Sequence, residues 1–196
     1  MTRRILPLVP LALLVLTFSN AAAAQASPMA FMKGIDGQLK PLLANAQANE
    51  KKIVKIVNKM LDFPTLCKNS LGKHWTAPER TEVQRKDFTK TLHALIEKNV
   101  VARLKDTKNH VITYESEEVD GKRGTVVTIV ADGPGPRAVQ TEIAYKLRKQ
   151  GSKWVVVDMV TDGVSLTSNY RSQFNKIITQ DGWDVMMQKM RDKLAE

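Results

Sequence analysis

The chain has 196 residues, 43% of them hydrophobic, a composition typical of a folded globular protein. Its single cysteine, Cys67, excludes an internal disulfide, and burial as a small apolar side chain is the role expected of it. The formal net charge of +10 disfavours basic partners and favours a membrane surface, an acidic protein or nucleic acid. The excess of lysine and arginine lies mainly between residues 27 and 104.

The N-terminal segment has the three parts of a secretory signal peptide. Two arginines precede the apolar run Ile5–Phe18, and the alanine-rich segment Ser19–Ala26 supplies small residues for cleavage. The apolar run is shorter than the ~18 residues that a membrane-spanning helix needs. We therefore predict a signal peptide over residues 1–26, cleaved after Ala24 or after Ala26.

The remaining residues, 27–196, are expected to form one exported domain. A chain of this length can bury roughly 70% of the surface that its unfolded form exposes. No long apolar run follows the signal peptide, so we expect a soluble mature protein. Export argues against nucleic acid as the anionic partner.

Helical periodicity marks the first half of this domain. The second predicted helix carries apolar residues on one face and Lys51, Lys52, Lys55 and Lys59 on another. These lysines form either a solvated basic face or a docking stripe for an anionic partner. The predicted helices cover Pro28–Gln47, Glu50–Leu61, Phe63–Leu71 and the residues from Thr81, a suitable N-cap, to about Leu104.

Alternating apolar and polar residues predict strands in the second half. The four strands are His110–Val119, Gly124–Ala131, Arg137–Gln150 and Lys153–Thr161. They form two hairpins, and taking Asp120-Gly121 and Gly151-Ser152 as two-residue turns fixes both registers. Apolar residues then collect on one face of the sheet, with Thr128 on the other. The predicted pairs are Val119 with Lys122, Tyr114 with Val127, Ile112 with Ile129, Leu147 with Val156, Tyr145 with Asp158 and Ile143 with Val160.

The stretch from Trp154 to Phe174 organises the C-terminal part of the chain. It reads as a buried strand, a break at Asp162-Gly163 and a helix that Ser165 can cap. Helices are predicted over Ser165–Gln180 and roughly over Gly182–Leu194. The fold class is therefore α+β: N-terminal helices, a four-stranded twisted antiparallel sheet made of two hairpins, and two C-terminal helices, all packed over one apolar sheet face.

A wide apolar surface is the most informative functional feature of the predicted fold. It is either a closed core or the lining of a cavity. The residues predicted to form it are Ile112, Tyr114, Val127, Ile129, Ile143, Tyr145, Leu147, Val156 and Val160 from the sheet, opposed by Phe88, Leu92, Leu95, Tyr170 and Phe174 from the helices.

Catalytic and metal-binding patterns do not stand out in the sequence. His74, His93 and His110 lack the spacing of a zinc site, so we expect no metal and no catalytic residues. Asp158, inside an apolar strand, is the residue on which an enzyme reading depends, as a general base in a pocket. The structural alternative is that Asp158 accepts hydrogen bonds from Tyr145 or from amides at the start of a helix.

The sequence resembles the MlaC family, also called the toluene-tolerance family, of periplasmic phospholipid-binding shuttle proteins. The resemblance is carried by W-x-V-x-D followed by D-G-V-S-L and N-Y-R-x-Q-F between Trp154 and Phe174. Two further blocks match, Leu71-Gly72-x-x-Trp75 and the series Gln84, Phe88, Leu92 and Leu95. The Gly-Pro-Gly-Pro connector between the hairpins and the lysine-rich helix are not part of this signature.

The resemblance implies a carrier that is not an enzyme and has no cofactor. Its cargo would be a phospholipid whose acyl chains lie in a cavity between the twisted sheet and the helices. The implied partners are an inner-membrane ABC transporter with an MCE-domain subunit and an outer-membrane lipoprotein complex, with transient contact to the membrane surface. Two other functions stay open: a periplasmic enzyme that uses Asp158, and an envelope interaction module that binds no small ligand.

Overall fold

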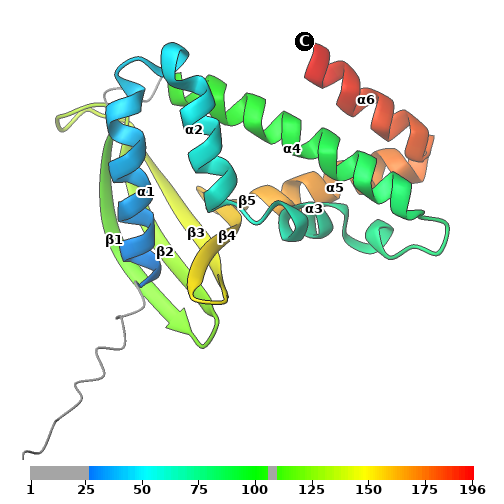
Figure 1. Cartoon of the computed structure of the whole chain (residues 1–196), viewed down its shortest axis with the longest axis horizontal. Helices are drawn as coiled ribbons and strands as arrows, with labels where there is room; N and C mark the ends of the chain where they lie inside the picture. Colours follow the sequence, from blue (N-terminus) through cyan, green and yellow to red (C-terminus); the bar gives the residue numbers. More distant parts are fainter. Residues whose placement is uncertain (1–26, 106–109) are drawn as a thin grey trace, which may run out of the picture.

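The computed structural model describes residues 27–105 and 110–196, so the predicted signal peptide lies outside the described residues. The described helices are α1 (Pro28–Leu43), α2 (Ala46–Met60), α3 (Phe63–Leu71), a 3₁₀ turn η1 (Gly72–Trp75), α4 (Glu82–Lys105), α5 (Leu166–Asp181) and α6 (Trp183–Ala195). The strands are β1 (Val111–Asp120), β2 (Arg123–Ala131), β3 (Gln140–Gln150), β4 (Lys153–Thr161) and β5 (Val164–Ser165). They form one antiparallel sheet in the order β1-β2-β3-β4-β5 (Figure 1). The α+β class is confirmed, and the short β5 adds a strand to the four that were predicted.

Side-chain caps fix where the helices begin. The Thr81 hydroxyl accepts from the Gln84 amide at 3.2 Å, and the Gln84 side chain accepts from the Thr81 amide at 3.0 Å. This reciprocal capping box satisfies two amides at the start of α4. Ser165 caps α5 through one such bond, since its hydroxyl accepts from the Ser168 amide at 3.1 Å. Both predicted caps are confirmed.

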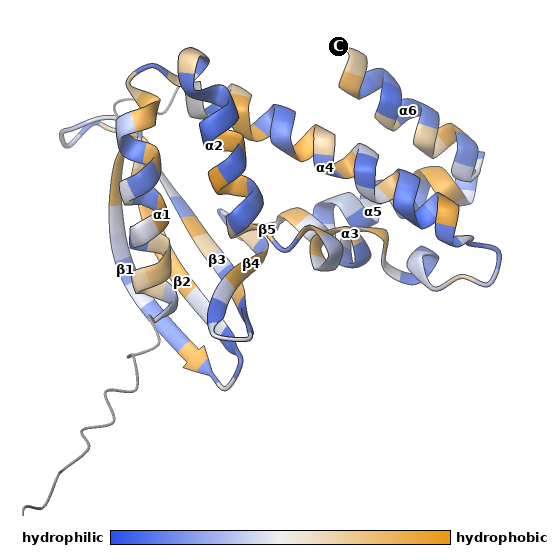
Figure 2. Ribbon diagram, viewed as in Figure 1, coloured by the Kyte–Doolittle hydropathy of each residue, from blue (hydrophilic) through white to orange (hydrophobic). Residues whose placement is uncertain are grey.

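The helices are arranged in two groups around the sheet. α1 and α2 lie over one face of the sheet, while α3, α5, α6 and the first part of α4 form a helical lobe beside it (Figure 1). The long α4 runs from this lobe to α2 (Figure 1). Figure 2 shows hydrophobic and hydrophilic residues on different sides of α2, as expected for a helix that packs on one side only. No helix among the described residues is both long and apolar enough to span a membrane.

The first hairpin differs from its predicted register. Asp120 pairs with Arg123, so the turn is Gly121-Lys122 and the predicted pairing of Val119 with Lys122 is wrong. Gly121 has a φ of +56°. Among the described residues, Asp162 is the one residue other than glycine with a positive φ, so Lys122 has a negative φ. A glycine followed by a residue of negative φ is the pattern of a type II′ turn, which the second hairpin also has at Gly151, with φ of +60°.

A bulge then changes the faces of the first hairpin. The register shifts between Tyr114 and Ser116, which leaves Glu115 as the extra residue. Beyond the bulge, Tyr114 pairs with Thr128 instead of Val127. The observed partners of Ile112 and Ile129 are Val130 and Thr113, so the predicted pair of these two isoleucines is also wrong.

The second hairpin follows its prediction as far as a bulge. The predicted turn is confirmed, since Gln150 pairs with Lys153 and Leu147 with Val156. Val157 is then an extra residue, and every later pair is shifted by one. The observed pairs are Lys146 with Asp158, Tyr145 with Met159, Ala144 with Val160 and Ile143 with Thr161, so the predicted partners of Tyr145 and Ile143 are wrong.

These shifts reverse the predicted faces of β2. Val126 and Thr128 are 0% and 1% exposed, and both point toward the helices. Alternation along the strand then directs Val127 and Ile129 to the opposite face. Val160 lies on that face too, since it pairs with Ala144 in a row with Val127. The prediction that Ile129 faces the helices and Thr128 faces away is therefore wrong.

Two matched substitutions test these faces. Thr128→Glu would place a carboxylate in a closed interior, where an unpaired charge costs several kcal/mol, so we expect a large loss in the free energy of unfolding. Ile129→Glu points away from the helices, and a loss of about 1 kcal/mol is expected. Urea denaturation followed by circular dichroism measures both. The assigned faces are incorrect if Ile129→Glu is the more damaging change.

Candidate lipid-binding site

The interior between the sheet and the first two helices is apolar. One buried cluster joins residues of α1, α2 and the sheet, so this region is continuous and not a set of separate contacts. Its members include Met32, Ile35 and Leu39 of α1, Ile53, Val57 and Met60 of α2, and Val126, Leu147, Trp154 and Val156 of the sheet. The sequence analysis did not assign the α1 and α2 residues to the site, although their helical spacing was available as a signal.

The structure places the predicted sheet residues on two faces. On the face covered by helices lie Ile112, Tyr114, Ile143, Tyr145, Leu147 and Val156. Ile112 is at the end of this row and is 42% exposed. Val127, Ile129 and Val160 lie on the opposite face, for the reasons given above. Any contact of these three residues with a ligand would have to be made outside the interior.

The predicted helical residues gather mainly in the helical lobe. The Phe88 ring packs edge-on against Phe174, with centroids 5.4 Å apart, and lies 6.0 Å from the Trp183 ring. Tyr170 stacks on Phe174 at 5.5 Å and is hydrogen-bonded to Asn99 of α4. Leu92 and Leu95 are also buried on α4. Phe88 and Phe174 thus join helices to one another, and their role as lipid contacts stays a prediction.

A polar cluster interrupts the apolar interior under α1. The Tyr114 hydroxyl of β1 donates to Asp36 of α1, and the Tyr145 hydroxyl of β3 is hydrogen-bonded to the Thr128 side chain. The Thr128 hydroxyl also donates to the Ile143 carbonyl at 3.2 Å. Lys33, one turn before Asp36, places its ammonium 5.1 Å from the centre of the Tyr114 ring. We refer to Asp36, Tyr114, Tyr145 and Thr128 as the α1–sheet polar cluster.

Burial dominates the acid–base behaviour of this cluster. It raises the pKa of Asp36 above the ordinary value, although the hydrogen bond from Tyr114 acts in the opposite direction. Burial, together with the neighbouring carboxylate, raises the pKa of Tyr114 far above its usual range. Burial also raises the pKa of Tyr145 to about 12. Both tyrosines are therefore neutral hydrogen-bond donors at physiological pH.

Asp158 has a structural role at the exit of the sheet. One carboxylate oxygen accepts from the amides of Met159 and Thr167, at 2.9 and 3.0 Å, and the other accepts from the Ser165 hydroxyl at 2.6 Å. The predicted contact with amides at a helix start is confirmed, whereas the structure gives no contact between Asp158 and Tyr145. A carboxylate held by three donors at the start of α5 is poorly placed to accept a substrate proton.

Asp62 joins α3 to the sheet. Its side chain accepts from the Thr65 amide at 3.2 Å, which caps α3, and forms an ion pair with Arg148 of β3. Its own amide donates to the Val156 carbonyl of β4 at 2.9 Å. Burial alone would raise the pKa of Asp62, but hydrogen bonds from Thr65 and Arg148 and the Arg148 charge outweigh it and lower this pKa.

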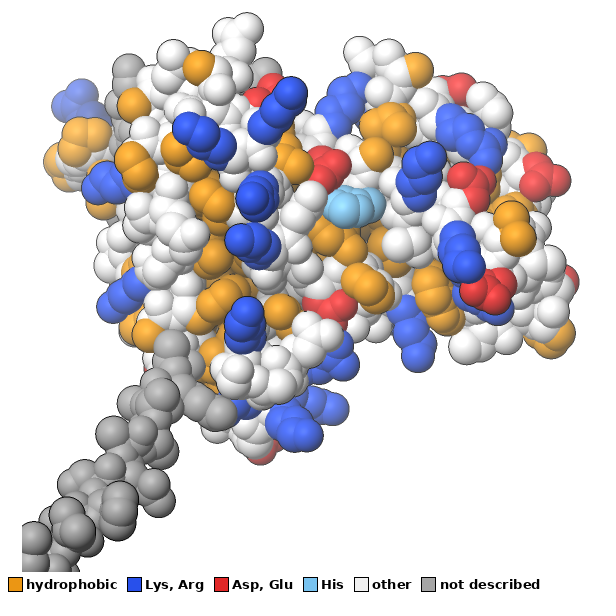
Figure 3. All heavy atoms as spheres, in the orientation of Figure 1, with side chains coloured by type: hydrophobic (Ala, Val, Ile, Leu, Met, Phe, Trp, Pro, Cys, Tyr) orange, Lys and Arg blue, Asp and Glu red, His pale blue; other side chains and the backbone are white. Residues whose placement is uncertain are grey.

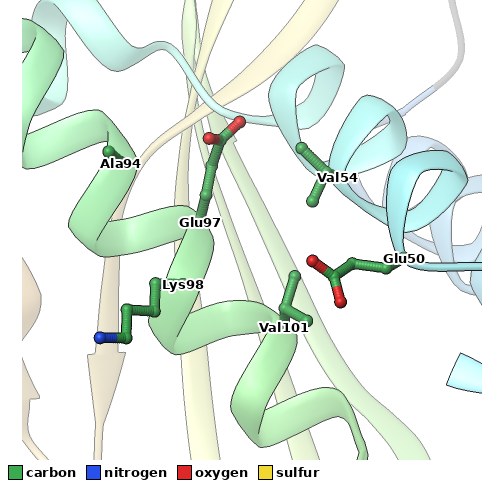
Figure 4. A pocket seen from close by; sticks show the side chains of 6 residues that line it. All are labelled: Glu50, Val54, Ala94, Glu97, Lys98 and Val101. Carbon is green, nitrogen blue, oxygen red and sulfur yellow. The ribbon is translucent and has the colours of Figure 1, made fainter. Parts of the chain in front are cut away.

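Two cavities lie beside the helices. The first, of about 320 Å³, lies between α2 and α4, where Glu50 and Val54 of α2 face Glu97 and Val101 of α4 (Figure 4). The second, of about 410 Å³, lies between η1 and α5 and is lined by Leu71, Lys73, His74, Ser168, Arg171, Ser172 and Asn175.

The four predicted docking lysines, Lys51, Lys52, Lys55 and Lys59, are all exposed on α2, and basic side chains follow this helix in Figure 3. Among the described residues, no cluster of His, Cys, Asp and Glu could hold a metal ion.

Comparison with known proteins identifies the family. A family model described as MlaC protein matches residues 33–192, which include every strand and most of every described helix. The chain belongs to the MlaC family. A curated MlaC relative, named the intermembrane phospholipid transport system binding protein of Haemophilus influenzae, is 28% identical over 91% of this chain and 87% of the relative.

A solved structure shows the same MlaC fold. It is the phospholipid-binding protein of Ralstonia solanacearum in complex with a phospholipid. The two structures superpose with a TM-score of 0.73 at 18% identity, covering 87% of this chain and 98% of the other. The resemblance that the sequence motifs indicated is thus confirmed at the level of family and fold.

The raised pKa of Asp36 gives a test of the α1–sheet polar cluster. The folded state holds a proton on this residue more readily than the unfolded state does. The stabilisation from this difference is complete below the unfolded pKa of ~3.9 and is lost as the pH rises through the folded pKa. Asp36→Asn keeps an acceptor for Tyr114 but cannot ionise. We therefore expect the free energy of unfolding of the wild type, relative to Asp36→Asn, to fall from about pH 4 to pH 7.

Urea denaturation across this pH range measures the difference, with Asp120→Asn in the exposed hairpin as a control for removing one carboxylate. A difference that is constant, or that grows in favour of the wild type with rising pH, would show that burial does not control the ionisation of Asp36.

Proposed function

We propose that this protein is a soluble periplasmic carrier that moves phospholipid between the outer and inner membranes. The match to the MlaC family over residues 33–192 carries this proposal, because it covers every element of the interior. The names of the Haemophilus influenzae and Ralstonia solanacearum proteins, which refer to phospholipid transport and phospholipid binding, support it. The proposed ligand is thus a phospholipid that is carried, and we propose no cofactor.

Simple energetics explain why such a lipid needs a carrier. Two acyl chains contain about 30 methylenes, and exposing each to water costs ~0.8 kcal/mol, so free passage through water would cost roughly 24 kcal/mol. A carrier must replace this apolar contact. The cluster between the sheet, α1 and α2 offers it, with the headgroup left near the surface.

The interior must open to take such a cargo. If each methylene needs about the ~30 Å³ that a water molecule occupies in the liquid, the chains fill roughly 900 Å³. The two cavities, of about 320 and 410 Å³, are each much smaller. We infer that the lipid enters when helices or strands that are in contact in this structure separate. Apolar side chains then lose contacts with one another and gain contacts with the lipid.

Two other functions are less well supported. A periplasmic enzyme would need a free base, and the carboxylate of Asp158 is engaged by Ser165, Thr167 and Met159. An interaction module without a small ligand would also show a packed interior and a basic helix, so the content of the purified protein decides between it and a carrier.

The carrier proposal predicts bound phospholipid. Protein purified from the periplasm is expected to contain about one phospholipid per chain, because the 1:1 complex avoids the exposure cost of the acyl chains. Native mass spectrometry and lipid extraction measure it, and protein stripped of lipid should take lipid up again from liposomes. Repeated preparations that contain no phospholipid and take none up would favour the module without a ligand.

The lysines of α2 are proposed to guide the carrier to acidic partners, which the family resemblance suggests are an inner-membrane ABC transporter with an MCE-domain subunit and an outer-membrane lipoprotein complex. Exposed charges act mainly on the association rate and are screened over ~10 Å at 0.1 M salt. Lys51→Glu with Lys55→Glu should therefore slow lipid transfer several-fold at low salt and leave bound lipid unchanged.

A matched control reverses the same number of charges elsewhere, at the exposed Lys153 and Lys176. Transfer rates of wild type, variant and control are compared across a salt series. Rates for the α2 variant that equal those of the control at every salt concentration would remove this role from the helix.

A further inference from the structure

A cluster of three side chains joins α2 to α4 at the surface. His93 Nε2 lies 3.0 Å from Asn58 Oδ1 and 3.2 Å from Glu97 Oε1, while Asn58 Nδ2 donates to Glu97 Oε1 at 2.5 Å. Both contacts of His93 are to acceptors, so Nε2 is the donor in this arrangement. Asn58 belongs to α2, and His93 and Glu97 are one turn apart on α4. We call these three residues the α2–α4 clasp.

The clasp is accessible to water. The side chains of His93 and Glu97 are 34% and 28% exposed, and the His93 ring rests on Phe63, with centroids 3.7 Å apart. Hydrogen bonds at such a position exchange for bonds to water at small net cost, because the groups are not left unsatisfied when they separate. Within the described chain, these are the polar side-chain contacts that link α2 to α4.

The cavity next to the clasp lies between α2 and α4. Glu97 is both a clasp residue and part of the cavity wall, where Val54 and Val101 face each other from the two helices (Figure 4). On the same helices, Ile53 and Ile96 are buried in the apolar cluster that includes sheet residues. The cavity thus lies between two helices that both contribute to the apolar interior, while Glu50, Glu97 and Lys98 give it a polar rim.

The other borders of the interior are each joined to the sheet by several contacts. α1 is held on the sheet by the bond from Tyr114 to Asp36 and by the Met29 amide, which donates to Glu117 at 2.7 Å. α1 also fits closely against β2, since a Cβ added at Gly124 would lie 2.7 Å from the Pro28 side chain. Asp62 and Asp158 anchor α3 and α5 to the sheet, as described above.

We propose that the groove between α2 and α4 is the portal through which the acyl chains of a phospholipid enter and leave, and that the α2–α4 clasp must open for this passage. The inference rests on the proposed carrier function. The groove combines apolar walls, between two helices that also line the interior, with a border held by partly exposed hydrogen bonds. Its polar rim keeps the groove hydrated when no lipid passes.

Cross-linking the clasp tests the portal. In Asn58→Cys with His93→Cys, a short bis-maleimide would tie α2 to α4. Cys67 does not interfere, because it is buried and its pKa is raised to about 12, so it stays an unreactive thiol. The control is Asp87→Cys with Arg191→Cys, which replaces an ion pair of 2.6 Å between α4 and α6. The readout is exchange of fluorescent phospholipid with vesicles of phosphatidylethanolamine and phosphatidylglycerol.

We expect cross-linking at the clasp to slow exchange at least about tenfold, which corresponds to raising the opening barrier by 1.4 kcal/mol. The phospholipid already bound should be kept, and the control cross-link should change little. Exchange that is equally fast before and after cross-linking, or equally slowed by the control, overturns the portal. If the variant before cross-linking neither contains nor takes up phospholipid while the wild type does, the clasp is part of the lipid site and not a gate. If the wild type also lacks phospholipid, the carrier function itself fails.

Asn58→Ala tests the clasp without cross-linking. Loss of its hydrogen bonds should speed exchange about fivefold, the effect of one net hydrogen bond on an equilibrium constant. Asn175→Ala is the matched control, since Asn175 lies 3.1 Å from His74 in the same kind of contact between α5 and η1. An unchanged exchange rate in folded Asn58→Ala protein, or an equal increase in the control, removes the clasp from the opening step.

Discussion

Asp62 and Asp158 hold the helical lobe on the sheet through contacts at Val156 and Asp158, on either side of the bulge at Val157. The position of the interior depends on these contacts. Asp62 caps α3 and binds Arg148, and its amide is bonded to the Val156 carbonyl. Asp158, just beyond the bulge at Val157, accepts from the Thr167 amide in the first turn of α5. Because α3 and α5 are attached at the same point of β4, they cannot both move away from the sheet without losing charge-assisted hydrogen bonds. Flexibility of the interior is therefore expected elsewhere, between α2 and α4.

The elements could be predicted from the sequence because their signals are local. Thr81 with Gln84 and Ser165 with Ser168 fix helix starts through contacts within four residues. The faces of the sheet could not be predicted in the same way, because a bulge shifts every later side chain by one. Glu115 and Val157, the two extra residues, carry no turn-forming signature. The turn of the first hairpin could have been predicted from the second. Both turns begin with a glycine of positive φ, Gly121 and Gly151.

The candidate site was predicted in part for a related reason. Periodicity predicted one apolar side of α4, but Val83 on that side is 76% exposed, and periodicity does not say against what an apolar side packs. With 24 residues, α4 is long enough to serve two cores. Its first half brings Phe88 against Phe174 and Trp183, and its second half approaches α2 at the clasp. The choice of lining residues thus required the three-dimensional arrangement, whereas Leu147 and Val156, next to a correctly predicted turn, were placed on the right face.

The interior has to be a stable core when empty and a binding site when filled. A fully apolar border between the helices would stabilise the empty core but would resist opening. Separating it would expose apolar surface to water at a free-energy cost of ~25 cal/mol per Å². Polar borders lower that cost, since hydrogen-bonding groups that separate at the surface regain partners in water. The α1–sheet polar cluster and the α2–α4 clasp differ in that respect. The α1–sheet polar cluster contains Thr128, which is 1% exposed, and a carboxyl whose pKa is raised by burial, so separating it would disturb the buried face of the sheet. The clasp of Asn58, His93 and Glu97 is made of three partly exposed side chains that regain partners in water when they separate, which suits the proposed opening at this border.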